Sequence, residues 1–196
     1  MTLPMAHFLY HTDGFILGSR PSGEAGRWFD LFTNRFGRVR ALAAGVREFK
    51  SKLRYSLSEL ALVKISLVRG RGVWRIVYVE AIQAKPFDQA ARQAAARLFK
   101  LLVRLVIDEG RRRRVWQEIF GAYRFLSQTS FTPVELADFE LLVVWRILAA
   151  LGYCQTSPRL APFASRPWDK LLISDFNVAR ATARLIVDQA LYHSHL

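Results

Sequence analysis

The clearest chemistry in this chain lies in a basic segment, residues 46–57, which follows a run carrying two further arginines. The cations of this region are Arg38, Arg40, Arg47, Lys50, Lys52 and Arg54, with Arg27 nearby. Cations at this density neutralise phosphates, and interleaved aromatic rings can stack on bases. Candidate rings are Trp28, Phe36, Phe49 and Tyr55. The pattern predicts a nucleic-acid site; the alternative is a solvated basic loop whose aromatic residues belong to the core.

Two other basic clusters stand at predicted connections. Arg69 and Arg71 alternate with glycines between two strand-like runs, a pattern typical of a hairpin turn, and both arginines could still contact phosphate. Residues 111–114 are four consecutive arginines at a predicted helix start. Such a run is usually a solvated helix start, but four cations there oppose the helix dipole, and that unfavourable arrangement indicates an anionic partner as the alternative.

Patterns that mark enzymes are missing from the sequence. The four histidines, His7, His11, His193 and His195, lie near the chain ends and form no metal or acid–base spacing with carboxylates. The glycines match neither a phosphate-binding loop nor a dinucleotide fingerprint. Cys154 is the single cysteine, so neither an internal disulfide nor a cysteine zinc cluster is expected. We therefore expect a protein without catalytic activity, cofactor or metal.

Composition indicates an ordered protein with a polyanionic partner. Of 196 residues, 52% are hydrophobic, and 29 Lys and Arg against 16 Asp and Glu give a net charge of +13. Such a surface attracts nucleic acid, or else a membrane. No apolar run approaches the roughly 20 residues that span a bilayer. Residues 1–7 do not resemble a secretion signal, so we expect a cytoplasmic protein that associates with the nucleoid if DNA is its partner.

The first half of the chain reads as β-structure. Five runs rich in β-branched and aromatic residues are each bounded by glycine or turn residues. These runs are 14–18, 28–33, 39–43, 60–68 and 73–82. They predict a meander closed into a small five-stranded barrel of the oligonucleotide-binding type, whose face and flanking loops bind single strands.

The second half has helical periodicity, and Pro86 marks the change. We expect a barrel domain over 1–84 and a helical domain over 85–196, an α+β fold with a small bundle at its C-terminal end. Helices are expected over 87–109, 112–127, from Pro133 to Gly152 and over 175–192, with an irregular insert at 154–170. Thr132, Pro133 and Glu135 form a strong helix-start signal, a capping box with proline at the first helical position.

Several motifs in the first half resemble the RecO family of bacterial recombination mediators. They are Gly18-Ser19-Arg20, Gly23-Glu24-Ala25, Leu31-Phe32-Thr33, Phe36-Gly37-Arg38-Val39, Ala43-Ala44-Gly45-Val46-Arg47, Lys50-Ser51-Lys52-Leu53-Arg54 and Leu67-Val68-Arg69-Gly70-Arg71-Gly72. In the helical half, Leu151-Gly152-Tyr153 resembles the end of a family helix. Order and spacing over about 70 residues carry the resemblance.

The resemblance implies an oligonucleotide-binding barrel followed by a helical domain. It implies binding of single- and double-stranded DNA, annealing of complementary strands, and work with RecR to place RecA on strands coated by single-strand-binding protein. The DNA contacts carried over from the family would be Arg38, Arg40, Arg47, Lys50, Lys52 and Arg54. The charge pattern adds Arg27, Arg69 and Arg71 as candidates. The acidic, phenylalanine-ended tail of single-strand-binding protein would bind the helical domain, with Arg97, Arg104, Arg112 and Arg124 as possible rim cations.

The chain departs from the family pattern after Tyr153. Many relatives carry a four-cysteine zinc module there, whereas only Cys154 remains here and a proline-rich segment, 155–167, replaces it. Zinc is therefore not expected. Two other functions fit the same charge pattern: a basic barrel that binds RNA, and an adaptor whose basic surface binds acidic protein tails.

Overall fold

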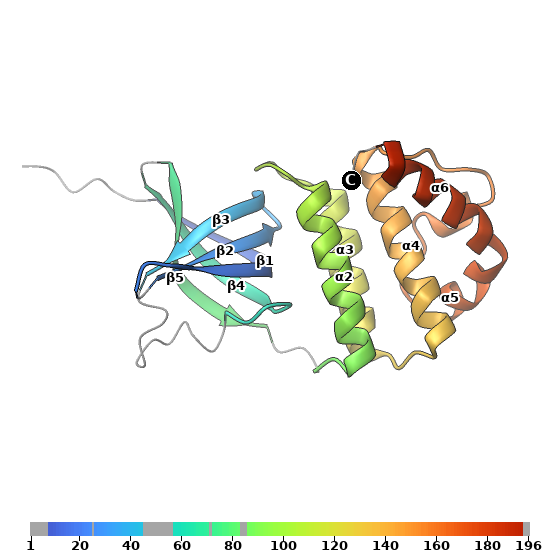
Figure 1. Ribbon diagram of the computed structural model, residues 1–196, viewed down its shortest axis with the longest axis horizontal. Coiled ribbons are helices and arrows are strands. Elements are labelled where there is room, and N and C mark those ends of the chain that lie inside the picture. The colour runs from blue at the N-terminus through green and yellow to red at the C-terminus, as the bar shows by residue number, and fades with distance from the viewer. Residues whose placement is uncertain (1–7, 25, 45–56, 71, 83–85, 194–196) are drawn as a thin grey trace, which may run out of the picture. The chain divides into compact units, whose positions relative to one another are not determined.

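The computed structural model describes residues 8–24, 26–44, 57–70, 72–82 and 86–193. Contacts divide the chain into two compact units. The first unit is Met1–Gln83 together with Val106–Arg112, and the second is Ala84–Leu105 together with Arg113–Leu196. Figure 1 labels the strands of the first unit and the helices of the second.

Five strands close into a barrel in the first unit. They are β1 (Leu9–Ser22), β2 (Gly26–Thr33), β3 (Gly37–Ala43), β4 (Leu62–Gly70) and β5 (Val73–Ala81), in the order β1-β2-β3-β5-β4. All pairs are antiparallel except β3 with β5. The predicted fold class, a five-stranded barrel followed by helices, is confirmed.

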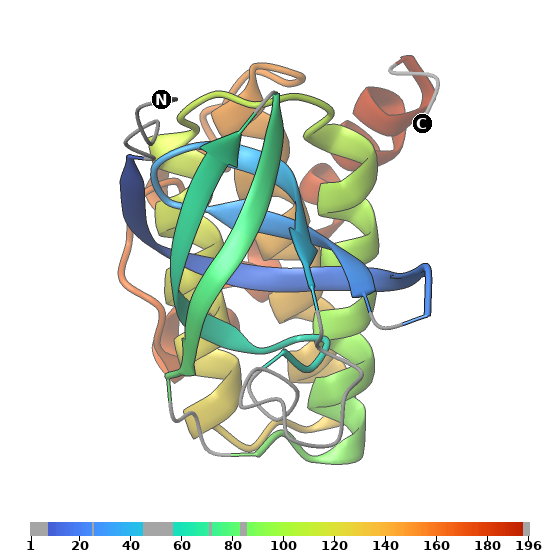
Figure 2. The same ribbon diagram turned by 90° about the vertical axis from the view of Figure 1, so that its left-hand side faces the viewer.

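Strand β1 is longer than the predicted run at 14–18. Its first half pairs with β4 and its second half with β2, so one strand serves both sides of the barrel. Figure 2 shows it as the blue ribbon running across the barrel. Gly14 and Gly18 lie inside the strand instead of bounding it, and the register with β2 shifts between Ile16 and Gly18. A bulge of this kind bends a strand, which closure requires.

Alternating side chains of each strand fill the barrel. Phe29 and Leu31 of β2, Val39 and Ala41 of β3 and Trp74 of β5 are among the buried core residues. Because side chains alternate along a strand, the residues between them face outward. Phe36 packs against this core: its ring lies 5.5 Å from that of Tyr10 and 5.0 Å from that of Trp74. Phe36 is therefore a partly buried ring whose neighbours are the core aromatics.

The segment 106–112 is part of the first unit, although it follows a helix of the second. Gly110 N donates to the Phe36 carbonyl (2.9 Å), Arg38 Nη1 donates to the Val106 carbonyl (3.2 Å), and Glu109 forms a β-bridge with Gly37. These contacts hold the backbone outside helical geometry. The helix predicted over 87–109 consequently ends at Leu105, and Gly110 does not terminate it.

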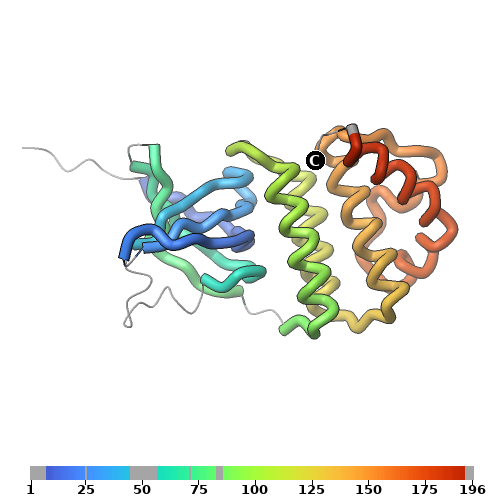
Figure 3. Tube along the Cα trace, viewed as in Figure 1, coloured from blue at the N-terminus to red at the C-terminus, as the bar shows by residue number. Residues whose placement is uncertain are grey.

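The second unit contains α2 (Gln89–Leu105), α3 (Arg113–Gln128), α4 (Pro133–Leu151), α5 (Lys170–Phe176) and α6 (Arg180–His193), whose path Figure 3 traces. The capping box predicted for α4 is confirmed: Thr132 Oγ1 accepts from Glu135 N, and the Glu135 carboxylate accepts from Thr132 N. A hydrogen bond from Lys170 and those of the cap lower the pKa of Glu135 to about 2. Gly152 ends the helix with a φ of 83°.

The last predicted helix, 175–192, is wrong in its bounds and its continuity. Helix α5 begins at Lys170, because the Asp169 side chain accepts from Leu172 N at 2.6 Å and caps it. A short 3-10 turn, Asn177–Ala179, then separates α5 from α6. The insert before it also contains a 3-10 turn, Ala161–Phe163.

Candidate nucleic-acid interface

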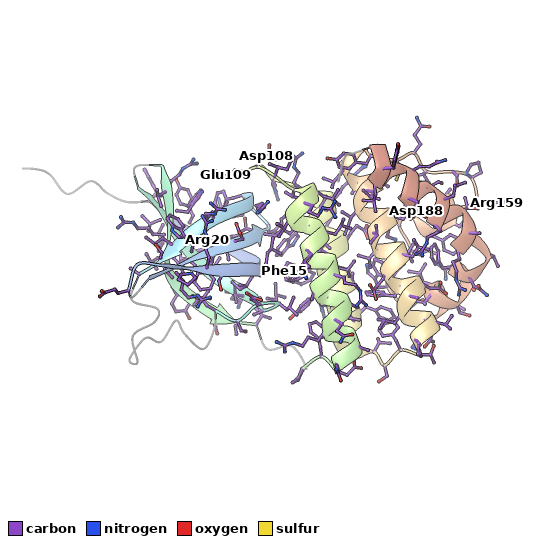
Figure 4. All side chains as sticks on the ribbon, viewed as in Figure 1. Phe15, Arg20, Asp108, Glu109, Arg159 and Asp188 are labelled. Carbon is purple, nitrogen blue, oxygen red and sulfur yellow. The ribbon has the colours of Figure 1, made fainter. Side chains whose placement is uncertain are left out.

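One row of side chains crosses four strands on the outer surface of the barrel. Arg20 of β1 is opposite Trp28 of β2, Trp28 is opposite Leu42 of β3, and Leu42 is opposite Arg75 of β5. Directly paired residues share one face of a sheet. Arg20 and Arg75 are exposed, and Trp28 is half-buried; Figure 4 labels Arg20 at its place on β1. We call Arg20, Trp28, Leu42 and Arg75 the outer row.

The neighbouring position of the same surface holds two arginines around one carboxylate. Asp30 of β2 is opposite Arg40 of β3 and Gly18 of β1. Its Oδ1 lies 3.6 Å from Nε of Arg40 and 3.6 Å from Nη2 of Arg38. Arg38 also donates to the Val106 carbonyl and has 17% of its side chain exposed, against 48% for Arg40. Arg40 is therefore the more available cation, and Asp30 cancels part of the local positive charge.

Two other predicted DNA contacts do not belong to this surface. Arg27 alternates with Trp28 along β2, on the same side as core residue Phe29, and its Nη2 donates to Ser19 Oγ at 2.8 Å. The Arg69 guanidinium lies 5.1 Å from the Trp74 ring centroid and 3.3 Å from a Glu109 carboxylate oxygen. Both arginines are thus engaged by neighbouring side chains.

The remaining predicted DNA contacts lie outside the described residues. They are Arg47, Lys50, Lys52, Arg54 and Arg71, together with the candidate rings Phe49 and Tyr55. The described chain leaves β3 at Ala44 and resumes at Leu57, which is buried in the barrel core. In strand β3, Val39, Ala41 and Ala43 face the core, so Arg38, Arg40 and Leu42 face outward. The basic segment follows this strand in the sequence.

Sequence reasoning missed Arg20 and Arg75. Neither lies in a basic cluster, and each is close to the outer row only through strand pairing. Another hollow of the barrel, with a volume of about 420 Å³, also contains cations, Arg35 and Lys64. Asp13 and Glu80 are opposite Lys64 on its two neighbouring strands, so the charges there balance. That hollow is a poorer phosphate site than the outer row.

The four rim arginines predicted for the helical half have different local surroundings. Arg97 forms a bidentate ion pair with Glu140: Nε and Nη2 each donate to one carboxylate oxygen. This pairing raises the pKa of Arg97. Arg112 pairs with Asp108 at 3.0 Å in the first unit, and the Arg124 guanidinium lies 5.9 Å from the Phe120 ring. Arg104 is exposed near the end of α2.

An apolar pocket of the second unit carries different arginines. It has a volume of about 560 Å³ between α4 and α6, with Val134, Ala137 and Leu141 in its lining. Arg180 and Arg184 of α6 also line it. Asp138 binds the Arg180 guanidinium with both carboxylate oxygens, whereas Arg184 is 71% exposed and 3.8 Å from Asp188.

The described ranges contain neither a metal-binding cluster nor a helix that could span a membrane. No group of three or more His, Cys, Asp or Glu side chains there could hold a metal ion. No helix of that part of the chain has the length and apolar character needed to cross a bilayer. The pKa of the Cys154 thiol is raised by burial, which makes it a poor nucleophile or metal ligand.

Comparison with known proteins decides the family. A family model described as "Recombination protein O N terminal" matches residues 5–84. A Streptomyces coelicolor protein named DNA repair protein RecO is 32% identical over 161 residues, which cover 76% of this chain. Proteins of the same name from Bifidobacterium longum and Gloeothece citriformis are each 29% identical, over 78% and 73% of this chain. Residues 5–84 of this chain belong to the RecO family.

The RecO family match at residues 5–84 contains all five strands of the barrel. The alignments extend beyond it, because they cover about three quarters of the chain. The chain spans 51% of the Gloeothece protein and 63% of the Bifidobacterium and Streptomyces proteins. These relatives are named as DNA repair proteins.

Proposed function

We propose that the barrel binds single- and double-stranded DNA through the outer row and Arg40, and anneals complementary strands there. The carrying observation is that Trp28 lies between Arg20 and Leu42, with Arg75 beyond, on one surface of the sheet. An aromatic ring with cations on the same surface stacks a base while the cations neutralise the adjoining phosphates. We further propose that four cations of the predicted basic segment, Arg47, Lys50, Lys52 and Arg54, also neutralise phosphates of the bound strand.

Annealing by such a surface needs no covalent chemistry. Two strands repel through their phosphates, and cations that neutralise both strands lower that repulsion. The counterions released make affinity fall steeply with salt. For about six phosphates, the slope of log affinity against log salt is roughly −5 for duplex and about −4 for single strands. The larger activity proposed, loading of RecA with RecR onto strands coated by single-strand-binding protein, builds on this binding.

Replacing Trp28 by alanine tests the stacking role. Loss of one base stacked on an aromatic ring costs about 1–3 kcal/mol, and about 1.4 kcal/mol is tenfold in affinity. We expect roughly 5- to 150-fold weaker binding of a labelled single strand, measured by fluorescence anisotropy over a salt series. Tyr78→Ala is the matched control, because Tyr78 is 53% exposed and lines the charge-balanced hollow. Equal losses in both variants would contradict the proposed row.

The same assay tests how much individual cations contribute to DNA binding. Arg40→Gln should weaken binding of all DNA sequences alike and reduce the magnitude of the salt slope by about 1, whereas Lys64→Gln should leave the slope unchanged.

A variant with Arg47, Lys50, Lys52 and Arg54 replaced by alanine should lose affinity for DNA while keeping its circular dichroism spectrum. An RNA strand of the same sequence distinguishes a DNA-binding protein from an RNA-binding one. A flat salt response would reject the mechanism.

Asp30→Asn should strengthen DNA binding. The substitution removes the carboxylate that lies 3.6 Å from both Arg38 and Arg40 and keeps the side-chain shape. Two unit charges about 4 Å apart attract each other by about 1 kcal/mol even in bulk water, which predicts at least roughly fivefold tighter binding. Asp13→Asn, on the charge-balanced hollow, is the control. If affinity does not change in a folded Asp30→Asn protein, the two arginines do not contact DNA.

We also propose that the acidic tail of single-strand-binding protein binds the apolar pocket between α4 and α6. A phenylalanine ring needs an apolar floor, which Val134, Ala137 and Leu141 supply, and acidic residues need a nearby cation. Arg184 is that cation, since Arg180 is already engaged by Asp138. This location replaces the rim of Arg97, Arg104, Arg112 and Arg124 inferred from the sequence.

Charge reversal at Arg184 tests this location. Placing like charges against each other at an interface is costly, so Arg184→Glu should weaken binding of a labelled acidic, phenylalanine-ended peptide by at least about tenfold. Arg104→Glu and Arg124→Glu make the same charge change at two of the earlier rim positions. If either of these substitutions weakens peptide binding and Arg184→Glu does not, the pocket between α4 and α6 is not the tail site.

A further inference from the structure

A second cavity of the helical unit lies between α3, α4 and the insert that follows α4. Its volume is about 410 Å³, which is within the range of small-molecule sites. Arg114 and Glu118 of α3, Trp145 and Arg146 of α4, and Thr156 of the insert line it. None of these residues belongs to the barrel surface proposed for DNA or to the pocket between α4 and α6.

Trp145 supplies a hydrogen-bond donor without an acceptor. Its side chain is fully buried, and its indole Nε1 has no hydrogen-bond partner among the residues that the structure describes. A buried N–H left unpaired costs about 1–3 kcal/mol, so such groups are rare. Indole nitrogen only donates, and an acceptor brought into the cavity would satisfy it.

Arg146 adds a second donor to the cavity. Its side chain is 3% exposed. Nε and Nη2 donate to the carbonyl of Phe163, Nη2 also donates to that of Arg166, and Nη1 donates to Glu118 at 3.3 Å. Each terminal nitrogen of a guanidinium carries two N–H groups, so Nη1 keeps one beyond its bond to Glu118.

Arg114 is the exposed cation of the cavity. It stands in the first turn of α3 and forms no ion pair with any described residue. Residues 111–114 place four positive charges at this helix start, against the helix dipole, and an anion there would relieve their repulsion. The single carboxylate of the lining, Glu118, is occupied by Arg146, and burial raises the pKa of Glu118. Donors therefore exceed acceptors in this cavity.

We propose that this cavity binds a small oxyanion, a carboxylate or a phosphate, held by Arg114 at the opening and by the Trp145 indole N–H inside. The unpaired indole N–H of Trp145, the second N–H of Arg146 Nη1, and a lining with two arginines against one carboxylate carry the proposal. Thr156 and Ser165, which also line the cavity, add hydroxyl groups that donate to further oxygens. The site does not depend on DNA binding by the barrel.

The test follows the indole N–H of Trp145 by nitrogen-15 NMR of the whole chain. The chain has five tryptophans, so five indole signals are expected, and Trp145→Phe assigns the one in question. Inorganic phosphate and citrate are titrated separately at constant ionic strength, which distinguishes a phosphate from a carboxylate site. We expect a saturable shift of the Trp145 signal with one of the two anions.

The matched pair Arg114→Gln and Arg113→Gln makes the test decisive. Both remove one charge from the same helix start, and Arg114 but not Arg113 lines the cavity. We expect Arg114→Gln to lower the affinity for the anion at least about tenfold, as loss of one charge-assisted hydrogen bond implies. Arg113→Gln should change this affinity by less than about twofold. The proposal is overturned if the signal does not move with either anion, or if both variants lower the affinity equally. Should Trp145→Phe fail to fold, the arginine pair alone still decides.

Discussion

Arg146→Met is expected to destabilise the helical unit by about 3–5 kcal/mol, the usual cost of removing one partner of a buried ion pair. Arg146 is the charged residue that holds the proline-rich insert: its guanidinium binds the carbonyls of Phe163 and Arg166. The same group lies 4.3 Å from the Trp168 ring centroid. Methionine replaces the aliphatic stem but leaves two carbonyls and Glu118 without their donor.

Urea unfolding followed by circular dichroism measures this loss. Arg104→Met is the control, since Arg104 is exposed and the same change there should cost less than about 0.5 kcal/mol. Adding Glu118→Gln to Arg146→Met should recover only part of the stability, because the carbonyls stay unpaired. A complete recovery would mean that Arg146 only neutralises Glu118 and does not hold the insert. A loss no larger than that of Arg104→Met would contradict the whole assignment.

Gly37→Ala is expected to destabilise the barrel unit by two effects that act together. Gly37 has a φ of 66°, a conformation that costs a side-chain-bearing residue about 1–2 kcal/mol. A Cβ at this position would also overlap the carbonyl of Gly110. Because that carbonyl belongs to the segment 106–112, alanine should separate this segment from β3, and the overlap should add about 1–3 kcal/mol.

Gly23→Ala isolates the second effect. Gly23 has nearly the same φ, 61°, but a Cβ there would meet no atom within 4 Å. We expect Gly37→Ala to be clearly more destabilising than Gly23→Ala in thermal unfolding. The near-ultraviolet signal of Trp74 should change only in Gly37→Ala, since Trp74 Nε1 donates to Glu109 of the same segment at 3.0 Å. Equal effects of the two alanines would show that the contact with Gly110 contributes nothing.

Much of the fold could be predicted from local patterns. Five β-rich runs, the change of period near Pro86, and the Thr132 to Glu135 cap all depend on residues close in sequence, and the barrel, the following helices and the cap are confirmed. The error in the first helix lies where a distant contact overrides the local pattern: it stops at Leu105, and the residues that follow bond to the barrel. The error in the last helix has a local source, because Asp169 caps a helix that begins at Lys170 and the 3-10 turn Asn177–Ala179 then interrupts it.

The candidate site shows the same division. Sequence reasoning chose cations by clustering, which found Arg38 and Arg40 but also Arg27 and Arg69, whose side chains are engaged by Ser19 and by Trp74 with Glu109. It missed Arg20 and Arg75, which stand alone in the sequence. Only strand register brings these two arginines onto the face of Trp28, and a shift of one residue would turn every side chain to the other face.

By itself the sequence determined the fold class, the excess of positive charge and the family, because hydrophobic period, net charge and motif order are all properties of the linear chain. The tertiary structure decided which charges can act together. Asp30 moderates Arg38 and Arg40, Glu109 engages Arg69, and Arg146 is buried under the insert, although an arginine in the sequence gives no sign of its partner. Partners are brought within bonding distance only by barrel closure and helix packing, so the available cations emerge from the fold.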